Sequence, residues 1–133
     1  MARANGLPPL LTVVSLLEAD RNLLTVMPDE LHGYALPPNV HVADLIPAHR
    51  LGGLVDAAVF HGGQGTVQTA CATGVPFAGM GLQPEQVWNV AVCAARGNAI
   101  ALSPRDAGTP KLSDAVRRLL EEDSFRRTAA EVA

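Results

Sequence analysis

Aromatic residues are scarce in this chain, and its basic residues are too few and too scattered to form a stripe. The sequence holds one Trp, one Tyr and three Phe, and thirteen Asp and Glu outnumber its ten Lys and Arg. A nucleic-acid interface needs clustered cations and, for single strands, aromatic side chains on which bases stack. The densest basic group contains Arg117, Arg118, Arg126 and Arg127, but acidic residues at 121–123 separate its two halves. We therefore predict a solvated helix face there and no nucleic-acid partner.

Cysteine and long apolar runs are lacking as well. The two cysteines, Cys71 and Cys93, stand in apolar, helix-like surroundings, where a cysteine behaves as a small core residue. We expect neither a disulfide nor a metal site from them. No run approaches the roughly 20 apolar residues that a membrane-spanning helix requires. The apolar run at 10–17 is followed by charged residues rather than by the small residues of a signal-peptide cleavage site, so we expect a cytoplasmic protein.

The sequence does have a regular alternation of short apolar runs and helical stretches. With 48% apolar and 17% charged residues over 133 positions, the chain suits one globular domain with a hydrophobic core. Short strands separated by helices are typical of a parallel sheet that helices cover, so the predicted fold class is α/β, Rossmann-like. We predict strands at 22–27, 39–42, 57–60, 77–80 and 99–102, and helices at 10–19, 47–54, 66–73, 84–95, 110–120 and 124–132.

A glycine-rich turn between a strand and a helix is the most informative local feature. Residues 60–66 read Phe-His-Gly-Gly-Gln-Gly-Thr. Glycines let a ligand approach the backbone, and the first N–H groups of the following helix favour an anion such as a diphosphate. His61 and Thr66 would add side-chain donors at the same place. A tight turn without a ligand has the same local pattern, so both interpretations stay open on this segment alone.

Glu85 and Gln86 follow the next predicted strand, at the sheet edge where ligands of parallel α/β sheets bind. A carboxylate beside a carboxamide offers the acceptors and donors that hold vicinal sugar hydroxyls. Asn89 lies about one helical turn beyond Gln86, on the same helix face. The alternative is an ordinary helix start in which Glu85 interacts with the helix dipole. Taken together with the glycine turn, the ligand-binding interpretation is favoured.

Four segments, in this order and spacing, resemble the C-terminal half of GT-B glycosyltransferases, in particular bacterial antibiotic glycosyltransferases and UDP-glycosyltransferase-like enzymes. The family pattern has a W-x-P-Q segment, an H-x-G-x-G-[ST] turn, a G-V-P strand entry and a [DE]-Q-x-x-N helix start. The matching segments are 45–48 (Leu-Ile-Pro-Ala), 56–66 (Asp-Ala-Ala-Val-Phe-His-Gly-Gly-Gln-Gly-Thr), 74–76 (Gly-Val-Pro) and 85–89 (Glu-Gln-Val-Trp-Asn). The resemblance covers about residues 36–133, and its combined motifs are far more specific than a glycine turn alone.

The resemblance implies a site for a nucleotide diphosphate sugar of UDP or TDP type, bound as a substrate, without a cofactor or a metal. It implies that the diphosphate is held by His61, Gly63, Gln64, Gly65 and Thr66. The sugar would contact Glu85 and Gln86, and the base would face Leu45 and Ala48. Leu45 stands where the family carries an aromatic residue that stacks on the base, and Ala48 stands where a Gln is common. Thr69 replaces the Glu with which plant members hold the ribose.

No catalytic residue is assigned, because the resemblance covers only the donor-binding half of the family fold. Family members carry their general base, usually a His, in an N-terminal acceptor domain. His32, His41 and His49 have no motif that marks a replacement. We interpret 1–35 as an N-terminal helix and strand, an atypical or truncated start in which the first strand of the fold is missing. Residues 36–133 are then the donor-binding domain.

Two functions remain open at this point. In the first, the chain is the donor-binding half of a hexosyltransferase, inactive alone, whose acceptor domain is separate or missing. In the second, it is a non-catalytic, truncated Rossmann-like module that binds a nucleotide weakly or packs against another protein. The retained glycine turn and Glu85 favour the first function, and Leu45, Ala48 and the missing strand favour the second. Either function leaves an apolar surface that the helix at 10–19 or a homodimer would cover.

Overall fold

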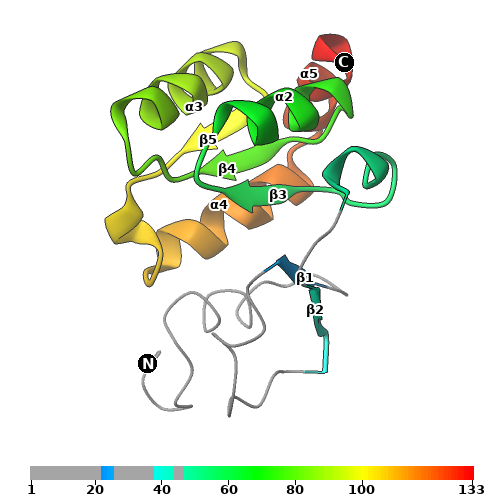
Figure 1. Cartoon of the computed structure of the whole chain (residues 1–133), viewed down its shortest axis with the longest axis horizontal. Helices are drawn as coiled ribbons and strands as arrows, with labels where there is room; N and C mark the ends of the chain where they lie inside the picture. The colour runs from blue at the N-terminus through cyan, green and yellow to red at the C-terminus, as the bar shows by residue number, and fades with distance from the viewer. Residues whose placement is uncertain (1–21, 26–37, 44–46) are drawn as a thin grey trace.

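The computed structural model of the protein describes residues 22–25, 38–43 and 47–133. Figure 1 shows the arrangement of its elements. The strands are β1 (Asn22–Thr25), β2 (Val40–Ala43), β3 (Ala58–Phe60), β4 (Phe77–Gly79) and β5 (Ala99–Ala101). The helices are α2 (Gln64–Ala72), α3 (Pro84–Arg96), α4 (Pro110–Glu121) and α5 (Asp123–Val132), with short 3-10 turns η3 (Ala48–Arg50) and η4 (Pro104–Asp106).

A parallel sheet with the strand order β3-β4-β5 forms the centre of the described fold. Its register pairs Ala58 with Phe77, and Phe77 in turn with Ala99. Helices α2 and α3 lie over one face of this sheet, and α4 lies over the other (Figure 1). The predicted α/β class, a parallel sheet covered by helices, is confirmed. The expected strands at 57–60, 77–80 and 99–102 agree with β3, β4 and β5 to within one residue at each end.

The two faces of β4 separate the core into two layers, because successive strand residues point to opposite faces. Phe77 packs with residues of α2 and α3, and its ring stacks on Phe60 with 4.5 Å between ring centroids. Ala78, the next residue, packs instead with Ala115, Leu119 and Phe125 of α4 and α5. Both Phe77 and Ala78 are fully buried. Helices α4 and α5 therefore complete the second layer of the core.

The first two strands depart from the expectation of one continuous sheet. β1 and β2 pair in parallel with each other, from Asn22 with Val40 to Thr25 with Ala43, and form a sheet of their own. This pair links residues on both sides of the boundary drawn at residues 35 and 36. The helix expected at 10–19 and residues 26 and 27 of the first expected strand lie outside the described residues.

Two expected helices have different bounds in the structure. The helix expected at 66–73 begins two residues earlier, because Gly63 serves as its N-cap and Gln64 and Gly65 already adopt the helical conformation. The helix expected at 47–54 is reduced to the 3-10 turn η3, followed by turns. A Cβ on Gly52, in those turns, would lie 3.1 Å from the Cβ of Thr73, the C-cap of α2. The helices expected at 84–95, 110–120 and 124–132 agree with α3, α4 and α5 to within one residue.

Val90 fixes the distance between α3 and the sheet. A methyl carbon of Val90 lies 2.4 Å from the position that a Cβ on Gly79 would occupy, and 2.5 Å from the corresponding position on Gly62. Val90 itself is 2% exposed. Its side chain thus fills a slot between two glycines that follow or end neighbouring strands, and α3 lies against β4 as closely as the backbone allows.

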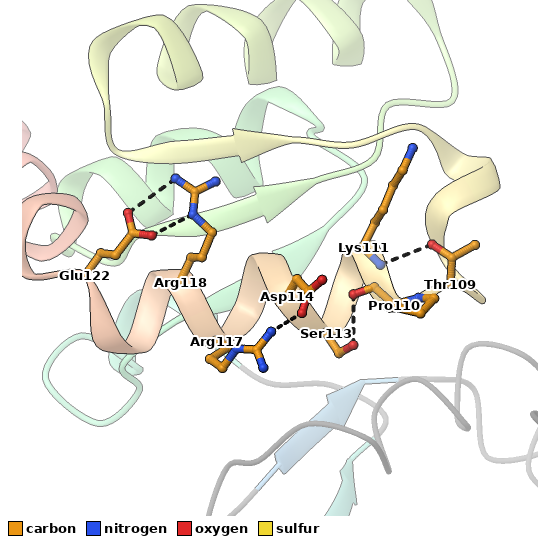
Figure 2. Close-up of polar contacts among 8 residues, drawn as sticks. All are labelled: Thr109, Pro110, Lys111, Ser113, Asp114, Arg117, Arg118 and Glu122. Carbon is orange, nitrogen blue, oxygen red and sulfur yellow. Dashed lines mark hydrogen bonds and ion pairs between the residues drawn. The ribbon is translucent and has the colours of Figure 1, made fainter.

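The basic residues near the C-terminus form the solvated face that their sequence predicts. Arg117, Arg118, Arg126 and Arg127 are all exposed. Figure 2 shows the contacts along α4, where Arg117 pairs with Asp114 and Arg118 forms hydrogen bonds of 2.7 and 3.3 Å with Glu122. The Arg118 guanidinium also lies 5.5 Å from the centre of the Phe125 ring. Arg117 and Arg118 are thus each partnered by a carboxylate close in sequence, as is typical of a solvated helix face.

The two cysteines are unlinked core residues, as the sequence predicts. Cys71 is half-buried on α2, Cys93 is buried on α3, and their Sγ atoms lie 4.0 Å apart. Burial, followed by the neighbouring Cys71, raises the pKa of the Cys93 thiol to about 11. Nearby, Asn98 is fully buried, and its Nδ2 donates to the Cys71 Sγ at 3.7 Å. In the described part of the chain, no cluster of His, Cys, Asp and Glu has the composition of a metal site, and no helix is long and apolar enough to cross a membrane.

Candidate functional site

The glycine turn delivers an uncapped helix N-terminus to the carboxyl end of β3. Gly63 is the N-cap of α2 and offers no side chain to its first turn. The backbone N–H groups of Gln64, Gly65 and Thr66 have no hydrogen-bond acceptor among the residues that the structure describes. Three free donors at the positive end of a helix dipole form a site that an anion satisfies.

Gly62 anchors this turn to α3. Its φ of 90° lies in the left-handed region, and a Cβ there would come within 2.9 Å of the Gln86 carbonyl oxygen. The Gly62 carbonyl oxygen accepts a hydrogen bond of 3.2 Å from Asn89 Nδ2. The turn is therefore held against the first part of α3 by backbone packing and by one side-chain hydrogen bond. Only glycine permits both the conformation and the close approach.

The first turn of α3 presents the predicted sugar-binding residues. Glu85 is exposed, and its Oε1 accepts a hydrogen bond of 3.4 Å from the same Asn89 Nδ2. Gln86 is half-buried, and its Oε1 accepts a hydrogen bond of 2.9 Å from the Leu82 backbone N–H. This carboxamide oxygen is thus engaged in fixing the loop before α3. Its amide nitrogen makes no hydrogen bond within the described residues and remains available as a donor.

An open pocket of about 450 Å³ lies between α2 and α3. Its lining residues are Gln64, Val67, Gln68, Glu85 and Asn89. Gln64 and Glu85, predicted on separate motifs, thus share one hollow. The sequence motifs did not single out Val67 and Gln68. Both nevertheless lie on the same helix face as Gln64, three and four residues further along α2. Apart from Val67 the lining residues are of polar types, and Glu85 is the one ionisable side chain among them.

The other predicted diphosphate residues surround the turn without lining this pocket. His61 is exposed, and its Nε2 lies 2.7 Å from the position that a Cβ on Gly63 would occupy. The imidazole therefore lies directly against the N-cap of α2. Thr66 is half-buried in the first turn of the helix. Gly65 has open space where a Cβ would stand, with no atom within 4 Å.

The residues predicted to face the nucleotide base, Leu45 and Ala48, are not part of the site described above. Ala48 is exposed on η3 and does not line the pocket. Leu45 lies outside the described residues. Thr69, at the position of the plant ribose-binding Glu, uses its hydroxyl to donate a hydrogen bond of 2.9 Å to the Gly65 carbonyl within α2. The described site thus comprises an uncapped helix N-terminus and an adjoining hollow lined by Gln64, Val67, Gln68, Glu85 and Asn89.

Comparison with known families gives one match over nearly the whole chain. The model of the C-terminal domain of erythromycin biosynthesis protein CIII-like proteins matches residues 11–133. The match therefore begins before the boundary between residues 35 and 36, which was drawn from the sequence motifs alone.

The curated relatives include sugar transferases of Streptomyces species. The chain is 35% identical over 126 residues to aclacinomycin-T 2-deoxy-L-fucose transferase of Streptomyces galilaeus, which covers 90% of this chain and 28% of that protein. It is 34% identical over 124 residues to TDP-daunosamine transferase DnrS of Streptomyces peucetius, with 90% and 29% coverage. The chain thus spans little more than a quarter of the length of these relatives.

Solved structures with the same fold are also glycosyltransferases. The glycosyltransferase VinC in complex with dTDP matches with a TM-score of 0.84 and 27% identity, over 98% of this chain and 34% of that one. SnogD from Streptomyces nogalater matches with a TM-score of 0.76 and 33% identity, over 95% of this chain and 34% of that one. The described fold is therefore the C-terminal, Rossmann-like half of a GT-B structure.

Proposed function

Because this chain belongs to the family of erythromycin biosynthesis protein CIII-like C-terminal domains, we propose that it is the donor-binding half of a glycosyltransferase. Its substrate is a nucleotide diphosphate sugar, from which a hexosyl group passes to an acceptor. The acceptor is held by a further domain, since the relatives are more than three times as long as the matched region. The same proposal places the protein in the cytoplasm.

The observation that carries this proposal is the shared pocket between the starts of α2 and α3. One wall comes from the first two turns of α2 through Gln64 and Gln68, and the other comes from Glu85 and Asn89 of α3. The three free N–H groups of α2 adjoin this hollow. A ligand with an anionic group at the helix terminus and hydroxyls toward Glu85 matches both parts, and a diphosphate sugar has this composition.

The geometry also supports a role in the transfer step. When an acceptor attacks the anomeric carbon, negative charge accumulates on the departing nucleoside diphosphate. Backbone N–H donors fixed before the reaction stabilise that charge without reorganising. His61, whose ring lies against Gly63, would donate a further hydrogen bond there. The described chain supplies this leaving-group stabilisation, and the acceptor domain supplies the base.

The relatives support thymidine diphosphate as the first nucleotide to test. DnrS is a TDP-daunosamine transferase, and the VinC structure contains dTDP. Leu45 and Ala48 differ from the aromatic residue and the Gln of the family pattern, so UDP is tested beside TDP.

Calorimetric titration of the purified chain with TDP, UDP, thymidine and uridine tests the donor site. We expect micromolar binding that requires the diphosphate. His61→Ala should weaken that binding by about 1–3 kcal/mol, the range for a charge-assisted hydrogen bond. His41→Ala is the matched control, because His41 is exposed on β2 and does not line the pocket.

Two results would contradict the proposal. Equal affinity of the His61→Ala variant would remove His61 from the site. Absence of binding to either diphosphate at millimolar concentration would make the glycine turn a purely structural feature. The alternative function, a non-catalytic module that packs against another protein, would then remain, and the exposed apolar side chains of α3 favour it.

A further inference from the structure

The outward face of α3 is apolar along its length. We define the α3 outer face as Leu82, Val87, Trp88, Ala91, Val92 and Ala95, all of which are exposed. It contains four of the six large hydrophobic side chains that are exposed in the described part of the chain, and Trp88 and Leu82 are 71% and 72% exposed. Single exposed apolar residues are ordinary, whereas a contiguous group of this kind marks an interaction surface.

This face carries no charge between the two ends of the helix. Within α3 the charged residues are Glu85 in the first turn and Arg96 in the last. By contrast, the exposed positions of α4 and α5 include several arginines and carboxylates. The apolar character of α3 therefore belongs to this helix and does not extend to the other helices of the domain. In Figure 1, α3 lies at the periphery of the fold, on the side of the sheet opposite α4.

The face is also rigid. Val90, on the buried side of α3, is locked between Gly62 and Gly79. Leu82 is fixed beside the helix by the hydrogen bond from its N–H to Gln86 Oε1. A Cβ on Gly81 would come within 2.5 Å of the Val87 nitrogen, so the loop that carries Leu82 lies directly on the helix. A preorganised apolar face loses little conformational entropy when it associates.

We propose that the α3 outer face binds a second copy of this chain, with the two α3 helices antiparallel about a two-fold axis. Glu85 and Arg96 are separated by three helical turns and so lie on the same side of α3, about 16 Å apart. Both are exposed, and neither forms an ion pair within the described residues. In an antiparallel pair, Glu85 of each copy faces Arg96 of the other, while the apolar residues between them meet at the centre.

The positions of Glu85 and Arg96 favour a second copy of the chain as the partner and an antiparallel orientation of the two α3 helices. A parallel pair would place Glu85 beside Glu85 and Arg96 beside Arg96, which is unfavourable. A two-fold antiparallel pair satisfies both charges twice and is self-complementary, as a closed dimer requires. One helix face on each side buries about 800–1,000 Å², at the lower limit of specific interfaces. The dimer should therefore be weak and should dissociate on dilution.

The single tryptophan makes this interface directly observable. Trp88 is the one Trp of the sequence, so intrinsic fluorescence reports on the centre of the face. We expect sedimentation equilibrium of the whole chain to show the mass doubling between about 5 and 500 μM. The Trp88 emission maximum should shift to shorter wavelength over the same concentration range, because the indole leaves water.

Variants that keep Trp88 locate the interface. Val92→Glu should remain monomeric with an unshifted emission maximum, because it buries a charge at the contact. Leu54→Glu is the matched control, since Leu54 is 76% exposed but lies outside α3, and it should dimerise like the wild type. Arg96→Glu should weaken dimerisation at least threefold, and adding Glu85→Arg should restore it. Because Glu85 also lines the pocket, these variants are compared by sedimentation alone.

Three outcomes would overturn the proposal. A monomer with an exposed Trp88 at every concentration would show that a second copy does not bind the α3 outer face and would favour a different polypeptide as its partner. A short-wavelength emission in a monomer would mean that the chain's own N-terminal segment covers the face. A dimer that persists in Val92→Glu and in Arg96→Glu would use another surface.

Discussion

At the scale of single residues, two glycines of the same turn have different physical reasons to be glycine. Gly62 has a φ of 90° and no room for a Cβ beside Val90 and Gln86, so the fold itself requires it. Gly65 lies in the first turn of α2 with open space around its Cα. A glycine in a helix costs about 0.5–1 kcal/mol relative to alanine, and nothing in the described fold offsets that cost. A ligand that approaches the backbone of Gly65 would account for it.

Alanine substitutions at these two glycines should therefore have opposite effects on stability. Gly65→Ala should raise the free energy of unfolding by about 0.5–1 kcal/mol and weaken diphosphate binding. Gly62→Ala should lower the free energy of unfolding by about 2 kcal/mol or more, because it combines a strained φ with steric overlap. Chemical denaturation checks the two stabilities, and calorimetry checks the binding of Gly65→Ala. A stabilised Gly65→Ala variant with unchanged affinity would show that the ligand does not approach this backbone.

At the scale of elements, proline and glycine residues at the ends of helices made most of the fold predictable. α3 begins at Pro84 and ends before Gly97, whose φ is 99°. Both residues are ordinary helix-boundary signals, so both ends of α3 could be predicted from the sequence. The start of α2 could not, because two glycines flanking Gln64 are typical of a turn and only the three-dimensional structure shows Gln64 and Gly65 in a helix. The separate pairing of β1 with β2 was also missed, since apolar runs do not specify their partners.

The candidate site was predictable to a similar degree. Gln64 and Glu85 could be named because each stands in a recognisable motif, and the structure brings them to one pocket. Val67 and Gln68 could not, because they are ordinary helix residues until α3 is placed beside them. The hydrogen bond from Leu82 N–H to Gln86 Oε1 was equally invisible in the sequence, where Gln86 suggests only a ligand contact.

The approach to α4 contains a carboxylate whose ionisation stabilises the fold. Asp106 accepts a hydrogen bond of 2.9 Å from the Ser103 N–H and forms an ion pair of 3.2 Å with Lys111. The Ser103 N–H first, and Lys111 second, hold the pKa of Asp106 below its ordinary value. A carboxyl whose pKa is lowered by folding contributes stability above its unfolded pKa, and that stability is lost as the pH falls through the folded pKa.

Asp106→Asn should consequently be less stable than the wild type at neutral pH. As the pH falls below about 4, the ordinary Asp value, the wild type loses its advantage and the two stabilities should converge. Thermal unfolding followed by circular dichroism between pH 2.5 and 7 measures this difference. A gap between the two proteins that stays constant down to pH 2.5 would show that the ionisation of Asp106 is not linked to folding.

At the scale of the whole molecule, the described residues provide for a donor and contain no placed general base. His41 and His49 are exposed on β2 and η3, and neither lines the pocket between α2 and α3. His61 lies at the N-cap of α2, where the leaving diphosphate is proposed to bind. Under the proposed function, the group that activates the acceptor hydroxyl is assigned to another domain.

The 133-residue chain alone should accordingly show no glycosyl transfer. We expect no product when it is incubated with TDP-sugars or UDP-sugars and small acceptor alcohols, even where calorimetry detects diphosphate binding. Chromatography with mass detection of the glycosylated acceptor measures this. Turnover by the purified chain would contradict the assignment of the acceptor and base functions to another domain.

The Val90 slot links three positions that the amino-acid sequence places far apart. Gly62, Gly79 and Val90 come from a turn, a strand and a helix, and each leaves only the space that the other two need. Any larger residue at position 79 would have to be accompanied by a smaller one at position 90, at the cost of loosening α3 from the sheet, whereas position 62 also needs glycine for its φ and its approach to Gln86. In evolution positions 79 and 90 should therefore change together or not at all, and position 62 should remain glycine.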